Sequence, residues 1–284
     1  MKFSLLVLIF IILVSGCNRR HPPKTMDPDL VYDSIPIYDA NSSLAPYNYD
    51  KFKPVLDKSR LQIYKDNPNT QNTQDSNNTT VEPGDFNEKK FPQFYADINA
   101  NLHFTITKKP NTYKVRSELK EQLDTWSTSD NVGHYWVATL RCLKPKTGIT
   151  SYTWMQIHGT KDSYNNPLLR LLWERDRQGL YDHIWAIIII SDPDTPKIYE
   201  YVDLGERPND YFTAEVYVKN NMMDIIINRQ VKRSINVTYW EKVQNYYKAG
   251  VYINRYGDGG TVSAIFKELH FYDYEPPNVV SVHH

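Results

Sequence analysis

The chain has 284 residues with 33 basic and 33 acidic side chains, so its formal net charge is zero. A neutral chain has no global basic field of the kind that gathers nucleic acid, and we expect no nucleic-acid partner. With 22 Tyr, 10 Phe and 6 Trp against 5 Met, the composition favours sheets over helix bundles and also suits stacking of aromatic rings on sugars.

The first 17 residues have the pattern of an export signal. Lys2 gives a positive start, and Leu5 to Val14 is an apolar run too short to span a bilayer comfortably. The ending Val14-Ser15-Gly16-Cys17 resembles the bacterial lipobox, in which the cysteine is lipidated and becomes the mature N-terminus. A plain signal peptide is the alternative. Since Asn18 is not the aspartate associated with inner-membrane retention, we expect a lipoprotein of the outer membrane or cell surface of a Gram-negative bacterium.

Composition divides the rest of the chain. Residues 18–47 contain five prolines with little periodicity, which predicts a tether. We expect one domain at 48–275, with a polar insert at 66–85, and a C-terminal tail at 276–284. Its first strand is predicted within 50–64. Cys142 is the only cysteine left after the signal, which excludes an internal disulfide and a cysteine metal site and indicates a buried thiol.

Most of the domain has the pattern of short strands separated by turn signals, which indicates an all-β sandwich or jelly roll. The strands are predicted at 101–107, 135–143, 150–158, 168–174, 183–191, 211–219, 222–228, 246–254 and 262–272. Residues 184–190 are apolar on both faces and are predicted to form a central strand. Residues 117–126 fit a helix through Leu119, Leu123 and Trp126, and their first part fits a strand equally well.

Three segments place polar side chains on one face, if each is a strand. The three sets are Tyr246, Lys248, Tyr252 and Asn254; Trp154, Gln156 and His158; and Arg116, Glu118 and Lys120. In the first set, Gly250 leaves a gap between the side chains. Each set alone has an ordinary explanation, namely a solvated strand face, a structural histidine and a surface ion pair.

Together, the three segments resemble the three signature motifs of polysaccharide lyase family 7, the alginate lyases. Arg116-Ser117-Glu118-Leu119-Lys120 is similar to the arginine motif, Gln156-Ile157-His158 matches the central motif, and Tyr247-Lys248-Ala249-Gly250-Val251-Tyr252 matches the C-terminal one. The resemblance extends over about residues 50 to 275. It implies a two-sheet antiparallel jelly roll with the motifs side by side in a concave groove. Lys120, Tyr247 and Asn254 depart from the usual Arg, Phe and Gln, which bears more on substrate preference than on activity.

The resemblance also implies roles in β-elimination on a uronic-acid polymer. Arg116, Gln156 and His158 would neutralise the sugar carboxylate, and Glu118 would hold Arg116 in place. Tyr252 would take the C5 proton and protonate the leaving oxygen, with His158 as an alternative base for one epimer. Nearby cations would favour the phenolate form of Tyr252. The other expected substrate-binding residues are Lys248, Lys120 and Asn254. No metal or other cofactor is required.

Several readings remain open at this point. Ile157 in the central motif favours alginate with guluronate-containing blocks. Lyases of glucuronan or ulvan would have a similar set of residues. A surface glycan-binding lipoprotein without turnover is a second class, and a glycoside hydrolase, with Glu118 and Glu268 as its two carboxylates, is a third. In each case we expect a monomer that binds a polysaccharide, anionic in the case of a lyase, and is attached to a membrane through a lipid on Cys17.

Overall fold

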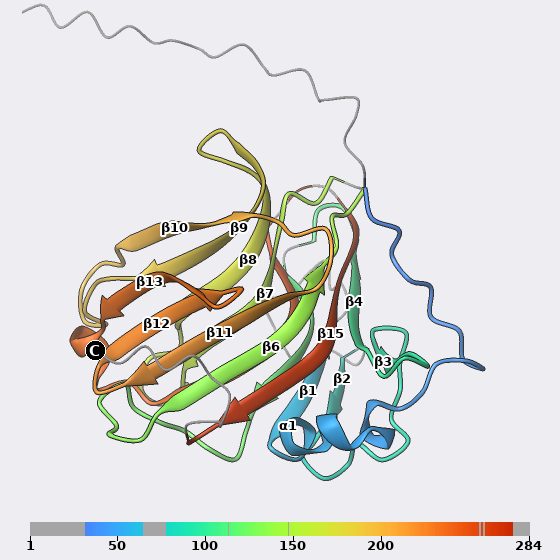
Figure 1. Cartoon of the computed structure of the whole chain (residues 1–284), viewed down its shortest axis with the longest axis horizontal. Helices are drawn as coiled ribbons and strands as arrows, with labels where there is room; N and C mark the ends of the chain where they lie inside the picture. Colours follow the sequence, from blue (N-terminus) through green and yellow to red (C-terminus); the bar gives the residue numbers. More distant parts are fainter. Residues whose placement is uncertain are drawn as a thin grey trace, which may run out of the picture. The chain divides into compact units, whose positions relative to one another are not determined.

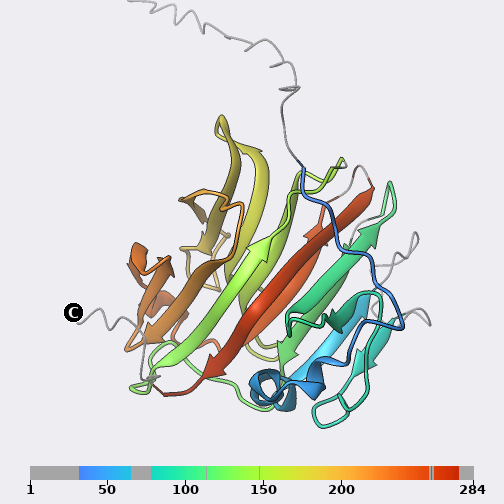
Figure 2. The ribbon, with the colours of Figure 1, turned by 45° about the vertical axis from the view of Figure 1, so that its right-hand side comes forward.

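Strands make up most of the computed structural model, which describes residues 32–64 and 78–274 apart from 113, 147, 256 and 258. They form two antiparallel sheets, as the sequence predicts (Figure 1). Figure 2 shows the two layers from a second direction, with β15 beside β6 in the nearer one. The expected signal segment with Cys17 and the tail at 276–284 lie outside the described residues.

The first sheet has eight strands in the order β10-β9-β8-β7-β14-β5-β1-β2. Its strands are β1 (Ser59–Tyr64), β2 (Thr79–Val81), β5 (Lys114–Glu121), β7 (Ser151–Gly159), β8 (Pro167–Arg177), β9 (Leu180–Ile189), β10 (Tyr199–Glu206) and β14 (Asn245–Asn254). The second sheet has seven strands in the order β13-β12-β11-β6-β15-β4-β3. These are β3 (Phe94–Ala96), β4 (Leu102–Lys108), β6 (His134–Cys142), β11 (Phe212–Lys219), β12 (Met222–Ile227), β13 (Gln230–Asn236) and β15 (Gly260–Tyr272).

The core lies between the sheets, because alternate side chains of each strand point toward the other layer. Trp136 of β6 packs against Trp154 of β7 and Phe266 of β15, with ring centroids 5.8 Å and 6.4 Å apart. Cys142 is fully buried and free, which confirms the predicted structural thiol. Aromatic contacts of this kind, made from both layers, fix how the sheets stack.

The ambiguous segment at 117–126 is a strand as far as Glu121. β5 pairs with β1 on one side and with β14 on the other, so its backbone is hydrogen-bonded along both edges. Leu119 is fully buried, whereas Leu123, beyond the strand, is 64% exposed. The helical spacing of the apolar residues therefore does not produce a helix, because pairing with two neighbouring strands, which the local sequence pattern does not reveal, stabilises a strand.

The prediction that residues 184–190 form a central strand is wrong. β9 is second from the edge, between β8 and β10. Its two apolar faces have a different origin. Ile184 and Ile188 join the main core, while Trp185 and Ile187 form a small second cluster with Leu172 on the outer face of the sheet.

The N-terminal boundary of the domain also differs from the prediction, because the described part of the expected tether is folded onto the domain. The described residues from Tyr32 onward fall in one unit. Asp33 accepts hydrogen bonds from Arg141 Nη2 (2.7 Å) and from the backbone N–H of Lys144 (2.8 Å), and Leu44 pairs with Ala96. The folded part therefore begins by Tyr32 rather than near residue 48.

The structure also gives the form of the residues just before β1 and of part of the expected insert. The first strand predicted within 50–64 is β1, at the end of that range, and residues 46–57 before it form short helical turns, namely η1 (Pro46–Asn48), η2 (Asp50–Phe52) and α1 (Lys53–Asp57). Phe52 and Val55 face the core from there, so their apolar character is kept with a different backbone. The insert expected at 66–85 contains β2, and residues 65–77 lie outside the described part. Within the described residues, no helix has the length and apolar character needed to cross a membrane.

Candidate active site

The three polar segments lie side by side, because β14 runs between β5 and β7 in the eight-stranded sheet. Lys248 is paired with Lys120 on β5 and with Gln156 on β7. Paired residues of antiparallel strands share a face. Tyr247, Ala249 and Val251 belong to the core, so these polar side chains occupy the opposite, outer face. We call this outer face of the eight-stranded sheet the motif face.

One predicted member of the set points the other way. Trp154 is fully buried and packs against Phe212 of the second sheet, with ring centroids 5.9 Å apart. A β-bulge between Thr153 and Met155 breaks the alternation of β7, so Thr153, and not Trp154, is paired with Tyr252. The extra residue of a bulge shifts side chains between faces. The expectation for Trp154 is therefore wrong.

Glu118 joins the three strands. It is 1% exposed, and its Oε1 accepts a hydrogen bond from Gln156 Nε2 at 2.6 Å. Its Oε2 lies 2.8 Å from Lys248 Nζ and 3.3 Å from Arg116 Nη1. The sequence suggested only the contact with Arg116. A buried carboxylate with three donors from three strands fixes all of them and balances part of their charge.

Gly250 lets β14 approach β5 at the level of Glu118. Its φ of +138° lies in a region that side chains rarely adopt, and an added Cβ would collide with the backbone oxygen of Ser117 and lie 2.8 Å from Cα of Glu118. The Cβ would also meet the Phe104 ring of the core at 3.0 Å. The glycine of the motif therefore serves the contact between two strands, and not, as expected, a gap on the outer face.

His158 is held as a neutral imidazole. Burial and then the charge of Lys248 lower its pKa to about 3. Its Nδ1 lies 2.8 Å from the carbonyl oxygen of Gly159, which requires Nδ1 to carry the proton. The neutral ring then has its lone pair on Nε2 and can accept a proton there.

Tyr246 supports this histidine. Its ring stacks on His158 at 5.3 Å between centroids, and its hydroxyl lies 3.2 Å from His158 Nδ1. Lys120 lies over the Tyr246 ring, with its Nζ 4.5 Å from the ring centroid. Burial raises the pKa of Tyr246 well above its ordinary value, so this phenol stays protonated. Sequence reasoning gave Tyr246 no role, since the strand pattern shows which face it is on but not its partner.

Tyr252 lies at the other end of the set. It is paired with Arg116 across the two strands, and the guanidinium carbon lies 4.5 Å from its ring centroid. Tyr64 of β1 lies close to the same guanidinium, at 5.1 Å. Arg116 Nε has no hydrogen-bond partner among the described residues. The Arg116 side chain is 16% exposed, so the guanidinium, close to both aromatic rings, remains partly accessible to an anion next to the Tyr252 side chain.

The cations outnumber the carboxylate at this site. Arg116, Lys120 and Lys248 face Glu118, and burial lowers the pKa of Lys248 to about 8 and, less strongly, that of Lys120. Three cations against one carboxylate leave the cluster with a net positive charge. Such a site is suited to an anionic ligand.

Asn254 lies at the end of β14 and lines a cavity of about 200 Å³ together with Tyr252. Its side-chain oxygen is buried without a hydrogen-bond partner in the described part of the chain. The pair of carboxylates considered for a hydrolase does not meet. Glu268 lies on β15 of the other sheet, where it is exposed and accepts a hydrogen bond from Thr139. Glu118 and Glu268 therefore cannot flank the same glycosidic bond.

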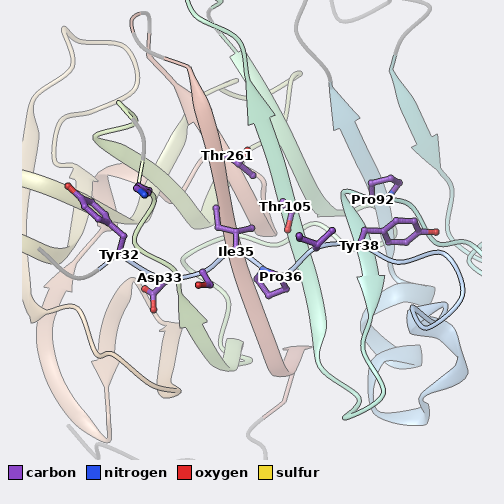
Figure 3. Close-up of a pocket in the computed structure, with 11 residues that line it drawn as sticks. Tyr32, Asp33, Ile35, Pro36, Tyr38, Pro92, Thr105 and Thr261 are labelled. Carbon is purple, nitrogen blue, oxygen red and sulfur yellow. The ribbon is translucent and has the colours of Figure 1, made fainter.

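A larger cavity, of about 970 Å³, lies under the N-terminal segment on the outer face of the second sheet. Figure 3 shows Tyr32, Ile35 and Tyr38 passing over Thr261 and Thr105 there. None of the motif residues lines it. Its one carboxylate, Asp33, is bound by Arg141 and also lies 3.2 Å from Arg207. Lys146 is the one basic residue of its described lining, so this cavity has no cluster of cations like that of the motif face.

A family model described as alginate lyase matches residues 56–275, more than three quarters of the chain. The chain belongs to the alginate lyase family. A curated alginate lyase from a Photobacterium species is 29% identical over 258 residues, which is 80% of this chain and 87% of that protein. The residues matched by the family model include the three motif segments, so the resemblance seen in the sequence is confirmed.

Solved structures show the same fold for this lyase. Alginate lyase AlyC3 superposes with a TM-score of 0.70 at 21% identity, covering 85% of this chain and all of that one. Alginate lyase A1-II′, a member of polysaccharide lyase family 7, gives 0.62 at 19% identity over 80% and 99%. The predicted jelly roll is thus confirmed, and the chain is a polysaccharide lyase of family 7. AlyC3 has also been solved with dimannuronate.

No group of three or more His, Cys, Asp or Glu side chains is placed to hold a metal ion in the described part of the lyase. Arg116, Glu118, Gln156 and Lys248 are brought into contact, with Tyr252 beside Arg116 and His158 at the opposite end next to Tyr246. Lys120 joins through Tyr246, and Asn254 through the cavity near Tyr252. The fold therefore gathers the eight residues predicted for catalysis and substrate binding on one face, although in two groups rather than one.

Proposed function

We propose that this lyase cleaves alginate by β-elimination on the motif face. The observation that carries the proposal is the Glu118 cluster, in which one buried carboxylate fixes Arg116, Gln156 and Lys248 beside Tyr252. Members of the family share this reaction type, and the relatives described above are alginate lyases. Alginate is an anionic polymer, which suits three cations facing one acid.

The reaction removes the proton at C5 of a uronate and breaks the bond between C4 and the glycosidic oxygen. The electron pair of the C–H bond becomes the C4–C5 double bond, and the leaving oxygen takes up a proton. Charge develops on the sugar carboxylate before that bond breaks, so fixed donors aimed at the carboxylate lower the barrier. Arg116 and the second amide hydrogen of Gln156 supply such donors, and Glu118 keeps both in position. His158, as a neutral ring with Nδ1 committed to Gly159, is better suited to accept a proton than to donate one.

Two residues can take the C5 proton, and they stand at opposite ends of the cluster. Tyr252 is paired with Thr153 and Arg116, while His158 is paired with Tyr246. Guluronate and mannuronate differ in configuration at C5, so their protons point to opposite sides of the ring. We assign Tyr252 as the acid for the leaving oxygen and as the base for mannuronate, whose C5–H and C4–O bonds lie on the same side. His158 is the base for guluronate, in which the two bonds are anti.

The preferred block is proposed to contain guluronate, on the basis of Ile157. This side chain is fully buried on the core face, so it acts only through the position of β7 and does not touch the polymer. The AlyC3 complex with dimannuronate shows that a related fold accepts the other epimer. Polymers rich in each epimer therefore have to be compared directly.

The test measures ultraviolet absorbance of unsaturated ends during incubation of the chain from residue 18 onward with guluronate-rich alginate, mannuronate-rich alginate, glucuronan and ulvan. We expect the fastest rise with guluronate-containing alginate and an unchanged rate with chelator. Tyr252→Phe is expected to lower kcat at least about a thousandfold with binding retained, since it removes the proton-transfer group. A faster rise in absorbance on glucuronan or ulvan would show that this polymer, and not alginate, is the preferred substrate. Binding of a polymer without any rise in absorbance would show that the protein binds glycans without cleaving them.

We also propose that the lyase is a monomeric lipoprotein anchored through Cys17 in the outer membrane or at the cell surface, where a polymer too large to enter the cell is accessible. The support is the signal pattern of residues 1–17. Cys17→Ala is expected to shift the protein from the membrane fraction to the soluble fraction of the expressing bacterium. Unchanged fractionation would exclude the lipid anchor.

A further inference from the structure

The cavity next to Tyr252 extends the motif face toward β8, β9 and β10. It has a volume of about 200 Å³, and three arginines line it, namely Arg170, Arg177 and Arg255. Glu174 is the only carboxylate among its lining residues. The cavity therefore repeats, on the other side of Tyr252, the excess of cations found around Glu118.

Two of the three arginines are already occupied. Glu174 is 1% exposed, and its Oε1 accepts hydrogen bonds from Arg177 Nη2 and Arg255 Nη2, both at 2.9 Å. Arg177 also donates from Nε to Oε2 of Glu174 and stacks over the Tyr201 ring at 4.2 Å. These contacts oppose the charge of both side chains and fix their orientation.

Arg170 is different. It is half-buried, and within the described residues it makes no hydrogen bond and no ion pair. Its position is fixed by register, because Arg170 on β8 is paired with Gln156 on β7 and with Ile187 on β9. A half-buried guanidinium whose five N–H donors have no partner among the described residues is free to bind an anion.

The register relates this cation to the reaction. Lys248, Gln156 and Arg170 follow one another across β14, β7 and β8, and neighbouring strands lie about 4.8 Å apart. A polymer that places its reacting carboxylate at Gln156 and runs across these strands brings its next residue over β8. That residue also carries a carboxylate, because every unit of the polymer is a uronate.

We propose that Arg170 binds the carboxylate of the uronate adjoining the one that is cleaved, on the side of the Glu174 cavity. This inference rests on the proposed lyase function. Arg170 forms a subsite by bidentate hydrogen bonding to the carboxylate, while Arg177 and Arg255, both bound to Glu174, form its wall. Arg170 holds the substrate and takes no part in proton transfer.

The test compares wild type, Arg170→Ala and Arg170→Lys on a hexasaccharide prepared from alginate. Arg170→Ala is expected to raise KM about tenfold or more and to change kcat by no more than about twofold. The reason is that the variant loses a charge-assisted hydrogen bond that is equally strong in the ground state and the transition state. Arg170→Lys is expected to fall between the two, because it keeps the charge without the fork. Arg229→Ala, which removes an exposed arginine from the turn between β12 and β13, is the control and should match wild type.

A binding measurement separates this inference from the lyase assignment. Calorimetric titration of the hexasaccharide into Tyr252→Phe, and into Tyr252→Phe combined with Arg170→Ala, is expected to show about tenfold weaker binding for the double variant. Equal dissociation constants, or an unchanged KM, would overturn the role of Arg170 even in an active lyase. A fall in kcat as large as the rise in KM would overturn it as well, since it indicates a structural or chemical role. Absence of unsaturated products from every uronan would instead count against the proposed function.

Discussion

Among single residues, Glu118 explains best why three motifs so far apart in sequence belong together. Its two oxygens contact Gln156 on β7, Lys248 on β14 and Arg116 on β5, the strand that also carries Glu118. Glu118 adds a negative charge to a site for an anion, which weakens anion binding. It also holds three donors in fixed positions, which offsets that cost. Preorganised donors are worth more than mobile ones, because no reorganisation is needed when charge develops.

His158 allows a prediction on pH. Its pKa is lowered to about 3 by burial and by Lys248, so the ring stays neutral throughout the range in which a free histidine titrates. We expect kcat/KM to show no acidic limb with a midpoint near 6.5, and the ¹⁵N shifts of His158 to report the Nδ1–H tautomer down to about pH 4. The same histidine in urea-unfolded protein should titrate normally. A folded-state midpoint between pH 6 and 7 would contradict the arrangement.

Among the elements, β14 decides the geometry of the site, since it is hydrogen-bonded to both other motif strands. Its pairing with β5 is regular, whereas its pairing with β7 shifts between Ala249 and Tyr252. This shift places Tyr252 beside Thr153 and turns Trp154 into the core. The site thus depends on one irregularity that moves side chains between faces without breaking the sheet.

Gly250→Ala tests this dependence. The new methyl group would meet the Ser117 oxygen and push β5 away from β14, and φ would be strained as well. We expect a loss of about 3 kcal/mol or more in the free energy of unfolding, measured in urea, together with a large loss of kcat through the displaced Glu118. Gly84→Ala is the control, because its φ is also positive but nothing lies within 4 Å, and it should lose about 1 kcal/mol. Equal losses in the two variants would show that contact with β5 is unimportant.

In the whole molecule, the sandwich is completed by contacts between segments distant in sequence. Asp33 joins the N-terminal segment to Arg141 and Arg207, so the domain includes a stretch whose prolines resemble a linker. Glu121, at the end of β5, accepts the backbone N–H of Tyr247 at 2.9 Å and is 2% exposed. This carboxyl group connects two strands of the site at a position removed from the substrate.

Glu121 predicts how stability changes with pH. Burial raises its pKa from 4.5 to about 7, so the folded protein holds this proton more tightly than the unfolded chain. The associated stability is complete below pH 4.5 and is lost as the pH rises through 7. Glu121→Gln stays neutral and keeps an acceptor for Tyr247.

Thermal unfolding measured from pH 4 to 9 checks this expectation. The variant should match wild type near pH 4 and exceed it by about 3 kcal/mol at pH 9, from about 1.4 kcal/mol per pKa unit. Glu88→Gln, at an exposed position, should follow wild type throughout. A constant difference between Glu121→Gln and wild type would contradict a raised pKa.

The sequence by itself determined the all-β class, most strand positions and the set of candidate residues, because two-residue alternation and turn signals are local properties. The motif resemblance placed Arg116, Gln156, His158 and Tyr252 in one site, and the fold brings them to one face. The motif resemblance also favours a strand at Arg116–Lys120, which β5 confirms. Only the tertiary structure decided that Trp154 faces the core and that Tyr246 stacks on His158. It also decided that Arg177 and Arg255 are paired while Arg170 has no partner among the described residues. Each of these depends on the register between strands that are remote in the chain, and no local pattern encodes that register.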